Sequence, residues 1–257
     1  MPAPGSTSPA RRRRILINQA RPSALATPDA ESPLLGECPF RGAVARLLEG
    51  SDPITWVFAG DSITHGALYT EGHRCFVEHF GERIRWELRR FDDMVLNAGV
   101  CGERTEGLLA ALDRRVLRFR PEVVGLLLGM NDCLAGVRGR EPFRRNLREL
   151  VGRIRQAGAL PVLQTPNLIY TPNATSRCDL PAYVQIIREE AAHLETPLID
   201  HWHDWCQTHP ELGAVLRWLQ DESIHPNLLG HRAMAQSVFR SLGLFDSHSL
   251  TCTLPLV

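Results

Sequence analysis

The chain has 257 residues, of which 44% are hydrophobic, and its 29 basic residues balance its 29 acidic residues. This length and composition are typical of one globular domain or of two small ones. The formal net charge of zero gives no reason to expect a nucleic acid or an anionic membrane as a partner, and we predict neither. The basic side chains are all arginines, which we interpret as the codon usage of a GC-rich bacterial genome.

The cysteines and the N-terminus bear on the compartment. Seven cysteines are scattered without a CxxC pair, which argues against a disulfide framework and favours a reducing compartment. The arginine run at residues 11–14 is followed by no long apolar segment, so no secretory signal is predicted. The longest apolar run, residues 123–130, is shorter than the roughly 20 residues of a membrane-spanning helix. We therefore expect a cytoplasmic bacterial protein without a membrane span.

The chain divides into a tail and one domain. Residues 1–35 are rich in Pro, Ala, Ser and Thr, which predicts a flexible N-terminal extension. Residues 36–257 contain no linker and no internal repeat, and we expect them to form a single domain.

Short apolar runs alternate with longer amphipathic segments through this domain. Strands are predicted at residues 54–59, 94–97, 123–128, 160–164 and 197–200. Helices are predicted at residues 76–90, 104–118, 142–156, 181–194, 212–219 and 228–242. The most continuously apolar strand, VVGLLL, is typical of a central strand covered on both faces. The alternation predicts an α/β fold with a parallel sheet and helices on both faces.

Polar, glycine-containing loops follow the first three predicted strands, and a fourth precedes the last helix. These loops are residues 60–62 (GDS), 97–102 (NAGVCG), 129–132 (GMND) and 221–227 (DESIHPN). Because the carboxyl ends of parallel strands meet at one edge of the sheet, we expect the loops to lie together. They contain a serine, a side-chain amide, glycines, a histidine and carboxylates. Acyl transfer uses this set as nucleophile, oxyanion donors, general base and orienting acid.

The four blocks resemble those of the SGNH hydrolases, also called the GDSL family, and occur in that family's order as GDSITHG, NAGVCG, GMND and HPN. They span residues 60–227, which is most of the predicted domain. The GxSxG elbow of another large hydrolase family is absent around Ser62. The resemblance implies a flavodoxin-like three-layer α/β/α sandwich with a central five-stranded parallel sheet. It also implies hydrolysis of a carboxylic ester without a metal or an organic cofactor.

The resemblance implies a role for each matching residue. Ser62 would be the nucleophile, and its backbone N–H would be one oxyanion donor. Gly102 would give a second N–H, with Gly99 as the alternative, and Asn131 would give a side-chain amide. His225 would be the general base and then the acid that protonates the leaving group.

The acid of the triad departs from the family pattern, which places an aspartate three residues before the histidine. Here that position is Glu222, and Asp221 lies one residue further back. We favour Glu222, because its additional methylene lets the carboxylate reach Nδ1 of His225 from a slightly withdrawn backbone. Asp221 and a Ser–His dyad without either carboxylate are alternatives. Asp61 and Asp132 are interpreted as residues that order their loops.

One further segment, DHWHD at residues 200–204, has the composition of a metal site. Residues two apart on a strand share a face, so His201 and His203 could chelate a metal there. The segment follows the end of a predicted strand, however, and no third ligand with clear spacing is seen. We therefore predict no metal site.

The resemblance implies a small-molecule ester as the substrate, and the family includes esterases, lipases, thioesterases and carbohydrate deacetylases. No apolar lid is visible between the blocks, and Glu71, His73 and Arg74 would give the site a polar rim. These features favour a short acyl group such as acetyl on a polar alcohol or sugar. The alternatives are an acyltransferase with the same machinery, a long-chain lipase or thioesterase, and a non-catalytic binding module. The oligomeric state is not predicted.

Overall fold

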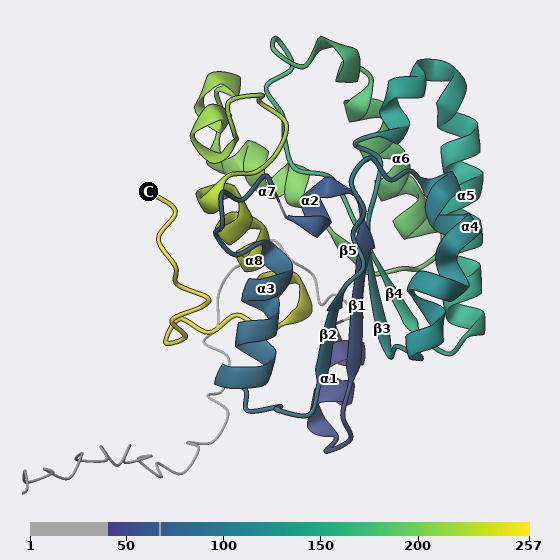
Figure 1. Cartoon of the computed structure of the whole chain (residues 1–257), viewed down its shortest axis with the longest axis vertical. Helices are drawn as coiled ribbons and strands as arrows, with labels where there is room; N and C mark the ends of the chain where they lie inside the picture. Colours follow the sequence, from purple (N-terminus) through teal and green to yellow (C-terminus); the bar gives the residue numbers. More distant parts are fainter. Residues whose placement is uncertain (1–40, 67) are drawn as a thin grey trace, which may run out of the picture. The chain divides into compact units, whose positions relative to one another are not determined.

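The computed structural model describes residues 41–66 and 68–257 (Figure 1). The predicted N-terminal extension, residues 1–35, lies outside the described residues. Within them, five parallel strands form one sheet with the order β2-β1-β3-β4-β5. The strands are β1 (Thr55–Gly60), β2 (Met94–Asn97), β3 (Val123–Leu127), β4 (Leu160–Gln164) and β5 (Leu198–Ile199).

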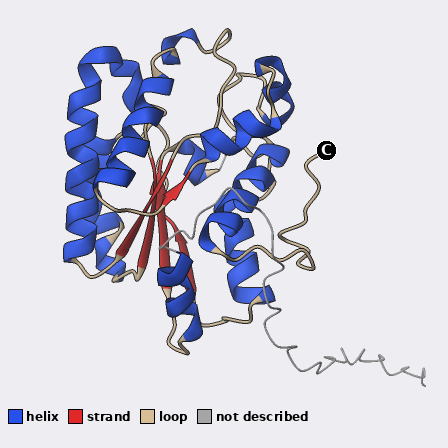
Figure 2. Cartoon of the chain, turned by 180° about the vertical axis from the view of Figure 1, so that it is seen from behind, coloured by secondary structure: helices blue, strands red, loops and turns tan. Residues whose placement is uncertain are grey.

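Helices cover both faces of the sheet, which Figures 1 and 2 show as the middle of three layers. One face carries α1 (Arg41–Glu49), α3 (Phe76–Gly81) and α8 (Leu228–Leu242), and the other carries α4 (Thr105–Arg115), α5 (Arg140–Gln156) and α6 (Leu180–His193). The shorter helices are α2 (Ser62–His65), η1 (Glu82–Glu87), η2 (Leu117–Phe119), η3 (Asp132–Gly139), η4 (Thr175–Arg177), α7 (His201–Thr208) and η5 (Leu212–Trp218). The predicted α/β/α sandwich with a five-stranded parallel sheet is therefore confirmed.

Aromatic side chains fix β1 against the helices on the α3 and α8 face. Trp56 and Phe58 point to this face because alternate residues of a strand share a side. Trp56 meets Phe80 of α3 edge-to-face, with ring centroids 5.1 Å apart, and Phe58 meets Phe76 in the same way at 5.8 Å. Phe80 in turn stacks on Phe239 of α8. This packing holds the strand that leads into the candidate nucleophile loop.

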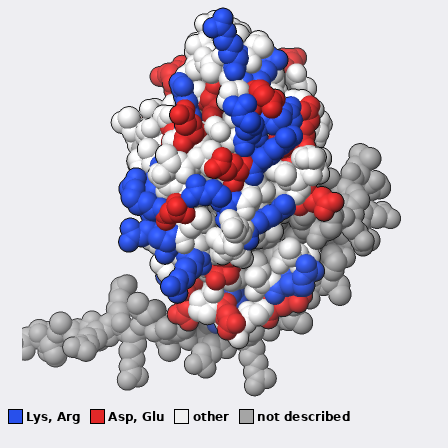
Figure 3. Space-filling view, turned by 90° about the vertical axis from the view of Figure 1, so that its right-hand side faces the viewer, with Lys and Arg blue, Asp and Glu red and all other residues white. Residues whose placement is uncertain are grey.

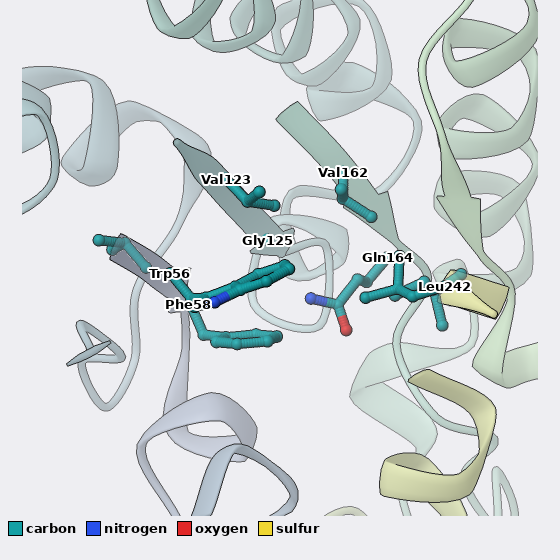
Figure 4. A pocket seen from close by; sticks show the side chains of 9 residues that line it. Trp56, Phe58, Val123, Gly125, Val162, Gln164 and Leu242 are labelled. Carbon is teal, nitrogen blue, oxygen red and sulfur yellow. The ribbon is translucent and has the colours of Figure 1, made fainter. Parts of the chain in front are cut away.

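The same face encloses a small cavity, which is lined by strand side chains and by Leu242 of α8 (Figure 4). The side chain of Gln164 points into it, and its Oε1 lies 3.0 Å from Nε2 of the buried His201. None of the residues that line the cavity belongs to the four sequence blocks. We therefore regard it as part of the interior packing.

The outer side of the opposite helical layer is charged. Figure 3 shows arginine and acidic side chains interspersed over this face. Arg144 and Arg148 of α5 both bind the buried carboxylate of Glu190 on α6, at 2.6 and 2.7 Å. Arg153 pairs with Asp113 of α4 at 2.8 Å. These pairs connect α4, α5 and α6 to one another across their surface.

The DHWHD segment, residues 200–204, begins a helix and is not part of a strand, so its two histidines do not share a face as they would in a strand. Asp200 is the N-cap of α7, and its carboxylate accepts a hydrogen bond from the backbone N–H of His203 at 3.0 Å. Residues two apart on a helix do not share a face. His201 is buried in the core while His203 is exposed, so the two imidazoles do not form a chelating pair.

Candidate active site

The loops of the first three blocks follow β1, β2 and β3. These strands are neighbours in the sheet, with β1 between the other two. The loop that carries Ser62 therefore lies between the loop that carries Gly102 and the loop that carries Asn131, at the carboxyl edge of the sheet (Figure 1). The fourth block precedes α8 and brings His225 to the same edge.

Ser62 is the first residue of the short helix α2 and is 6% exposed. Asp61 is the N-cap, and its Oδ1 accepts a hydrogen bond from the backbone N–H of Ile63 at 2.9 Å. Asn97, at the end of β2, donates a hydrogen bond from its side-chain amide to the carbonyl of Thr64 at 2.7 Å. These hydrogen bonds hold the short helix at both ends, and they therefore fix the position of the Ser62 backbone.

Ser62, His225 and Glu222 form a continuous chain of hydrogen bonds. Ser62 Oγ lies 2.8 Å from Nε2 of His225, and Nδ1 of His225 lies 2.5 Å from Oε1 of Glu222. The same carboxylate oxygen accepts a hydrogen bond from the backbone N–H of His225 at 2.8 Å. Glu222 therefore fixes both the backbone and the ring of the histidine.

The structure does not bring the alternative acid, Asp221, to the histidine. The Asp221 side chain is exposed, and its carboxylate has no hydrogen-bond or ion-pair partner among the described residues. The loop is tight here, since Ser223 has a φ of 65° and the N–H of Gln220 donates to the carbonyl of His225 at 2.8 Å. In this conformation the longer side chain at position 222 folds back onto the imidazole.

The environment of His225 suits a general base. Burial lowers the pKa of the imidazole, and the charge of Arg177 acts in the same direction. The hydrogen bond and the charge of Glu222 raise it, but the net shift is downward. The imidazole is therefore neutral at neutral pH and can accept the proton of Ser62.

The two glycines of the second block have different surroundings. A Cβ on Gly99 would lie 2.4 Å from the backbone nitrogen of His65, and the N–H of Gly99 already donates to Asn97 Oδ1 at 3.0 Å. Gly102 has a φ of 76°, and a Cβ there would meet nothing within 4 Å. Its N–H has no acceptor among the described residues. Gly99 thus serves close packing, while Gly102 has open space around its Cα and a backbone N–H without an acceptor among the described residues.

Asn131 is held in one orientation by an arginine that the sequence motifs do not include. Arg177 of η4 donates to Asn131 Oδ1 at 3.3 Å and to the carbonyl of Met130 at 3.2 Å. Asn131 Nδ2 donates to the carbonyl of Glu103 at 3.2 Å, which leaves its second hydrogen for a ligand. No periodicity marks Arg177 in the sequence, because it lies in the irregular chain between β4 and α6.

The two aspartates of the blocks both bind backbone. Asp132 accepts hydrogen bonds from the N–H and the hydroxyl of Thr105, at 2.9 and 2.7 Å, and from the N–H of Gly129 at 3.2 Å. Asp61 is fully buried, and its Oδ2 has no hydrogen-bond partner among the described residues. Burial, reinforced by the nearby charge of Asp132, raises the pKa of Asp61 to about 7. Both residues order their loops, as the sequence indicated.

A serine bonded to a histidine, a carboxylate behind it, and unoccupied N–H donors beside it are the parts of a serine hydrolase. The α/β/α fold carries them at the carboxyl edge of its parallel sheet. Residues 58–233 match the GDSL-like Lipase/Acylhydrolase family, and the chain belongs to this family. It is a serine esterase, that is, a carboxylic ester hydrolase.

Several bacterial enzymes are similar to the chain. Esterase TesA of Pseudomonas aeruginosa is 27% identical over 202 residues, which cover 78% of this chain and 93% of that protein. An arylesterase of Vibrio mimicus is 27% identical over 153 residues, covering 59% and 70%. An acetylxylan esterase of Geobacillus stearothermophilus is 24% identical over 210 residues, covering 73% and 93%.

Solved structures share the fold. Axe2, an acetylxylan esterase from Geobacillus stearothermophilus, superposes with a TM-score of 0.62 at 18% identity, covering 76% of this chain and 97% of that one. LAE5, an alpha/beta hydrolase enzyme from the metagenome of Lake Arreo, superposes with a TM-score of 0.63 at 23% identity, covering 77% and 99%. Across the described residues, no helix has the length and apolar character needed to cross a membrane.

Proposed function

We propose that the protein hydrolyses its ester through an acyl-enzyme on Ser62, with His225 as general base and Glu222 as the acid of the triad. The observation that carries this proposal is the hydrogen-bonded chain from Ser62 Oγ to Nε2 of His225, at 2.8 Å, and from Nδ1 to Glu222, at 2.5 Å. His225 takes the hydroxyl proton as Ser62 attacks the carbonyl carbon, and then gives it to the departing alcohol. A water molecule repeats the sequence to release the acid.

The negative charge of each tetrahedral intermediate would be held by three donors. These are the backbone N–H groups of Ser62 and Gly102 and the side-chain amide of Asn131. Such a donor is typically worth about 3–4 kcal/mol of transition-state stabilisation, because it is aimed at the oxygen before the charge develops. The free N–H of Gly102 and the fixed amide of Asn131 support this assignment.

For the substrate, we propose a short acyl group such as acetyl on a polar alcohol or sugar. Glu71, His73 and Arg74 are all exposed on the loop that follows the nucleophile helix, which supports a polar alcohol. The similarity to an acetylxylan esterase points the same way. A longer acyl chain is the second candidate, because exposed apolar side chains also occur on the segments that follow β1, β2 and β3: Leu68 and Val100 in loops, and Leu134 and Val137 in η3.

The proposed setting is the bacterial cytoplasm, with no nucleic-acid partner. All six cysteines in the described part of the chain are free, which supports a reducing compartment. The arginines that pair with acidic residues across α4, α5 and α6 form no uninterrupted basic surface in Figure 3.

Hydrolysis of p-nitrophenyl esters from acetyl to palmitoyl tests the proposal. The Ser62→Ala variant is compared with the wild type and with Ser51→Ala, which removes an exposed hydroxyl from the loop before β1. We expect Ser62→Ala to lose the activity, Ser51→Ala to keep it, and the wild-type rate to peak at acetyl or butyryl. A rate maximum at long chains would favour the second candidate. Full activity in Ser62→Ala would contradict the assigned nucleophile.

Transfer to an acceptor is measured in the same assay. A hydrolase gives the free acid as its main product when a sugar or another alcohol is added. An excess of the transferred ester over the free acid would identify an acyltransferase that uses the same residues.

A further inference from the structure

We propose that Tyr69 is a positioning residue for the catalytic reaction, whose ring holds the imidazole of His225 and stabilises its protonated form. This inference rests on the proposed function, because it takes His225 as the general base. No sequence block includes Tyr69, which lies in the loop between α2 and α3.

The geometry of the two rings is specific. The ring of Tyr69 is parallel to the imidazole of His225, with an angle of 6° between the planes and 3.5 Å between the centroids. At this separation the rings lie almost directly over one another. Two neutral aromatic rings prefer an offset arrangement, whereas a cation is attracted to the centre of a ring face. Face-to-face placement therefore favours the imidazolium over the neutral imidazole.

A single glutamine connects the two loops that carry these rings. Gln220 donates a hydrogen bond from its side-chain amide to the carbonyl of Tyr69 at 2.6 Å. Its backbone N–H donates to the carbonyl of His225 at 2.8 Å. The loop of Tyr69 is further closed by a hydrogen bond from Thr70 N–H to the carbonyl of Gly66 at 3.1 Å. The stack is thus held by the backbones on both sides.

The stack acts at the moment when the charge forms. His225 is neutral before the attack and becomes a cation when it takes the proton of Ser62. An interaction that strengthens only in the transition state raises kcat, whereas one present throughout does not. The other charged groups that act on this ring are Glu222, which favours the cation from the edge, and Arg177, which opposes it. The buried His231 has a pKa lowered to about 3 and is neutral where His225 takes up its proton. Tyr69 adds a favourable contribution from the face.

Substitutions at position 69 separate the ring from its hydroxyl. Tyr69→Phe keeps the stacked ring, while Tyr69→Leu and Tyr69→Met remove it. We expect Leu and Met to lower kcat by about 3- to 30-fold with little change in KM, and Phe to behave like the wild type. The substitutions are expected to fold, because Tyr69 is only half-buried and lies in a loop.

An NMR titration of the His225 imidazole provides a readout that does not depend on turnover. In a Ser62→Ala background, Tyr69→Leu and Tyr69→Met should lower the pKa of His225 by about half a unit to one unit, and Tyr69→Phe should leave it in place. Tyr170→Leu is the matched control, since Tyr170 also bonds the histidine loop, through its N–H to the carbonyl of Ser223 at 3.1 Å. It should leave the titration unchanged.

The outcomes that would overturn the role of Tyr69 differ from those that would refute the proposed function. An unchanged titration and kcat in both Tyr69→Leu and Tyr69→Met would overturn the proposal, and so would an effect on KM alone, which would assign Tyr69 to substrate contact. Full hydrolysis by Ser62→Ala would refute the proposed function instead. In that case the titration would still report whether the ring of Tyr69 stabilises the imidazolium.

Discussion

Replacing Glu222 by Gln removes the charge behind His225 while keeping the length of the side chain. If Glu222 is the acid of the triad, the imidazolium that forms during the attack loses its counter-charge, and kcat falls. Asp221→Asn is the matched control, because it makes the same chemical change one residue away on a carboxylate that has no partner among the described residues.

The size of the effect follows from distance and exposure. Oε1 of Glu222 lies 2.5 Å from Nδ1 of His225, and the Glu222 side chain is 41% exposed. Two unit charges about 4 Å apart attract by about 1 kcal/mol in water and by about 4 kcal/mol at an effective dielectric constant near 20. Because solvent screens the half-exposed carboxylate, we expect about 2 kcal/mol, which corresponds to a roughly 30-fold lower kcat.

Steady-state hydrolysis of p-nitrophenyl acetate measures both variants, and their far-UV circular dichroism spectra, compared with that of the wild type, establish that they are folded. We expect Asp221→Asn to stay within about twofold of the wild type. A larger loss in Asp221→Asn than in Glu222→Gln would reverse the assignment of the acid. Wild-type rates in both would leave a Ser–His dyad as the machinery and refute the reasoning from the hydrogen bond.

Three other outcomes are expected. The acid limb of the pH profile of kcat/KM should have its midpoint below 6.5, because burial lowers the pKa of His225 and only the neutral ring accepts a proton. Glu222→Gln should move it lower still. Arg177→Met should lower kcat about tenfold by freeing the Asn131 amide, and Arg177→Lys should not restore it, since lysine lacks the planar fork. In urea unfolding, Asp61→Asn should gain stability relative to the wild type as pH rises from 5 to 8. The folded wild type keeps a proton on Asp61 up to a pKa of about 7, whereas the unfolded chain loses it near 3.8. The wild-type free energy of unfolding therefore falls over this range. An advantage of Asp61→Asn that did not grow with pH would contradict the raised pKa.

The strands of the sheet follow from local patterns. β3 is buried along its whole length, and the uninterrupted run VVGLLL shows this directly in the sequence. α7 was missed because the chain turns into a helix immediately after the two residues of β5, with Asp200 as its cap. A five-residue segment with two histidines and two aspartates does not reveal whether its period is that of a strand or of a helix.

Some residues of the candidate site can likewise be predicted from the sequence, whereas others are found only in the structure. Ser62, Asn131 and His225 lie in short blocks at strand ends, so both their identity and their approximate location can be predicted. Tyr69 and Arg177 come from irregular loops, and their contacts exist only because tertiary packing brings those loops to the same edge. Periodicity carries no information about such contacts, and they have to be found in the structure.

The order of the site residues along the chain determines the order in which the parts of the site are synthesised. The proposed nucleophile and all three proposed oxyanion donors come from loops after β1, β2 and β3, whereas His225 comes from the loop before α8. During synthesis the chain emerges from its N-terminal side. A nascent chain would therefore make the residues of the anion-binding part first, and it would lack its general base until the loop before the last helix was made.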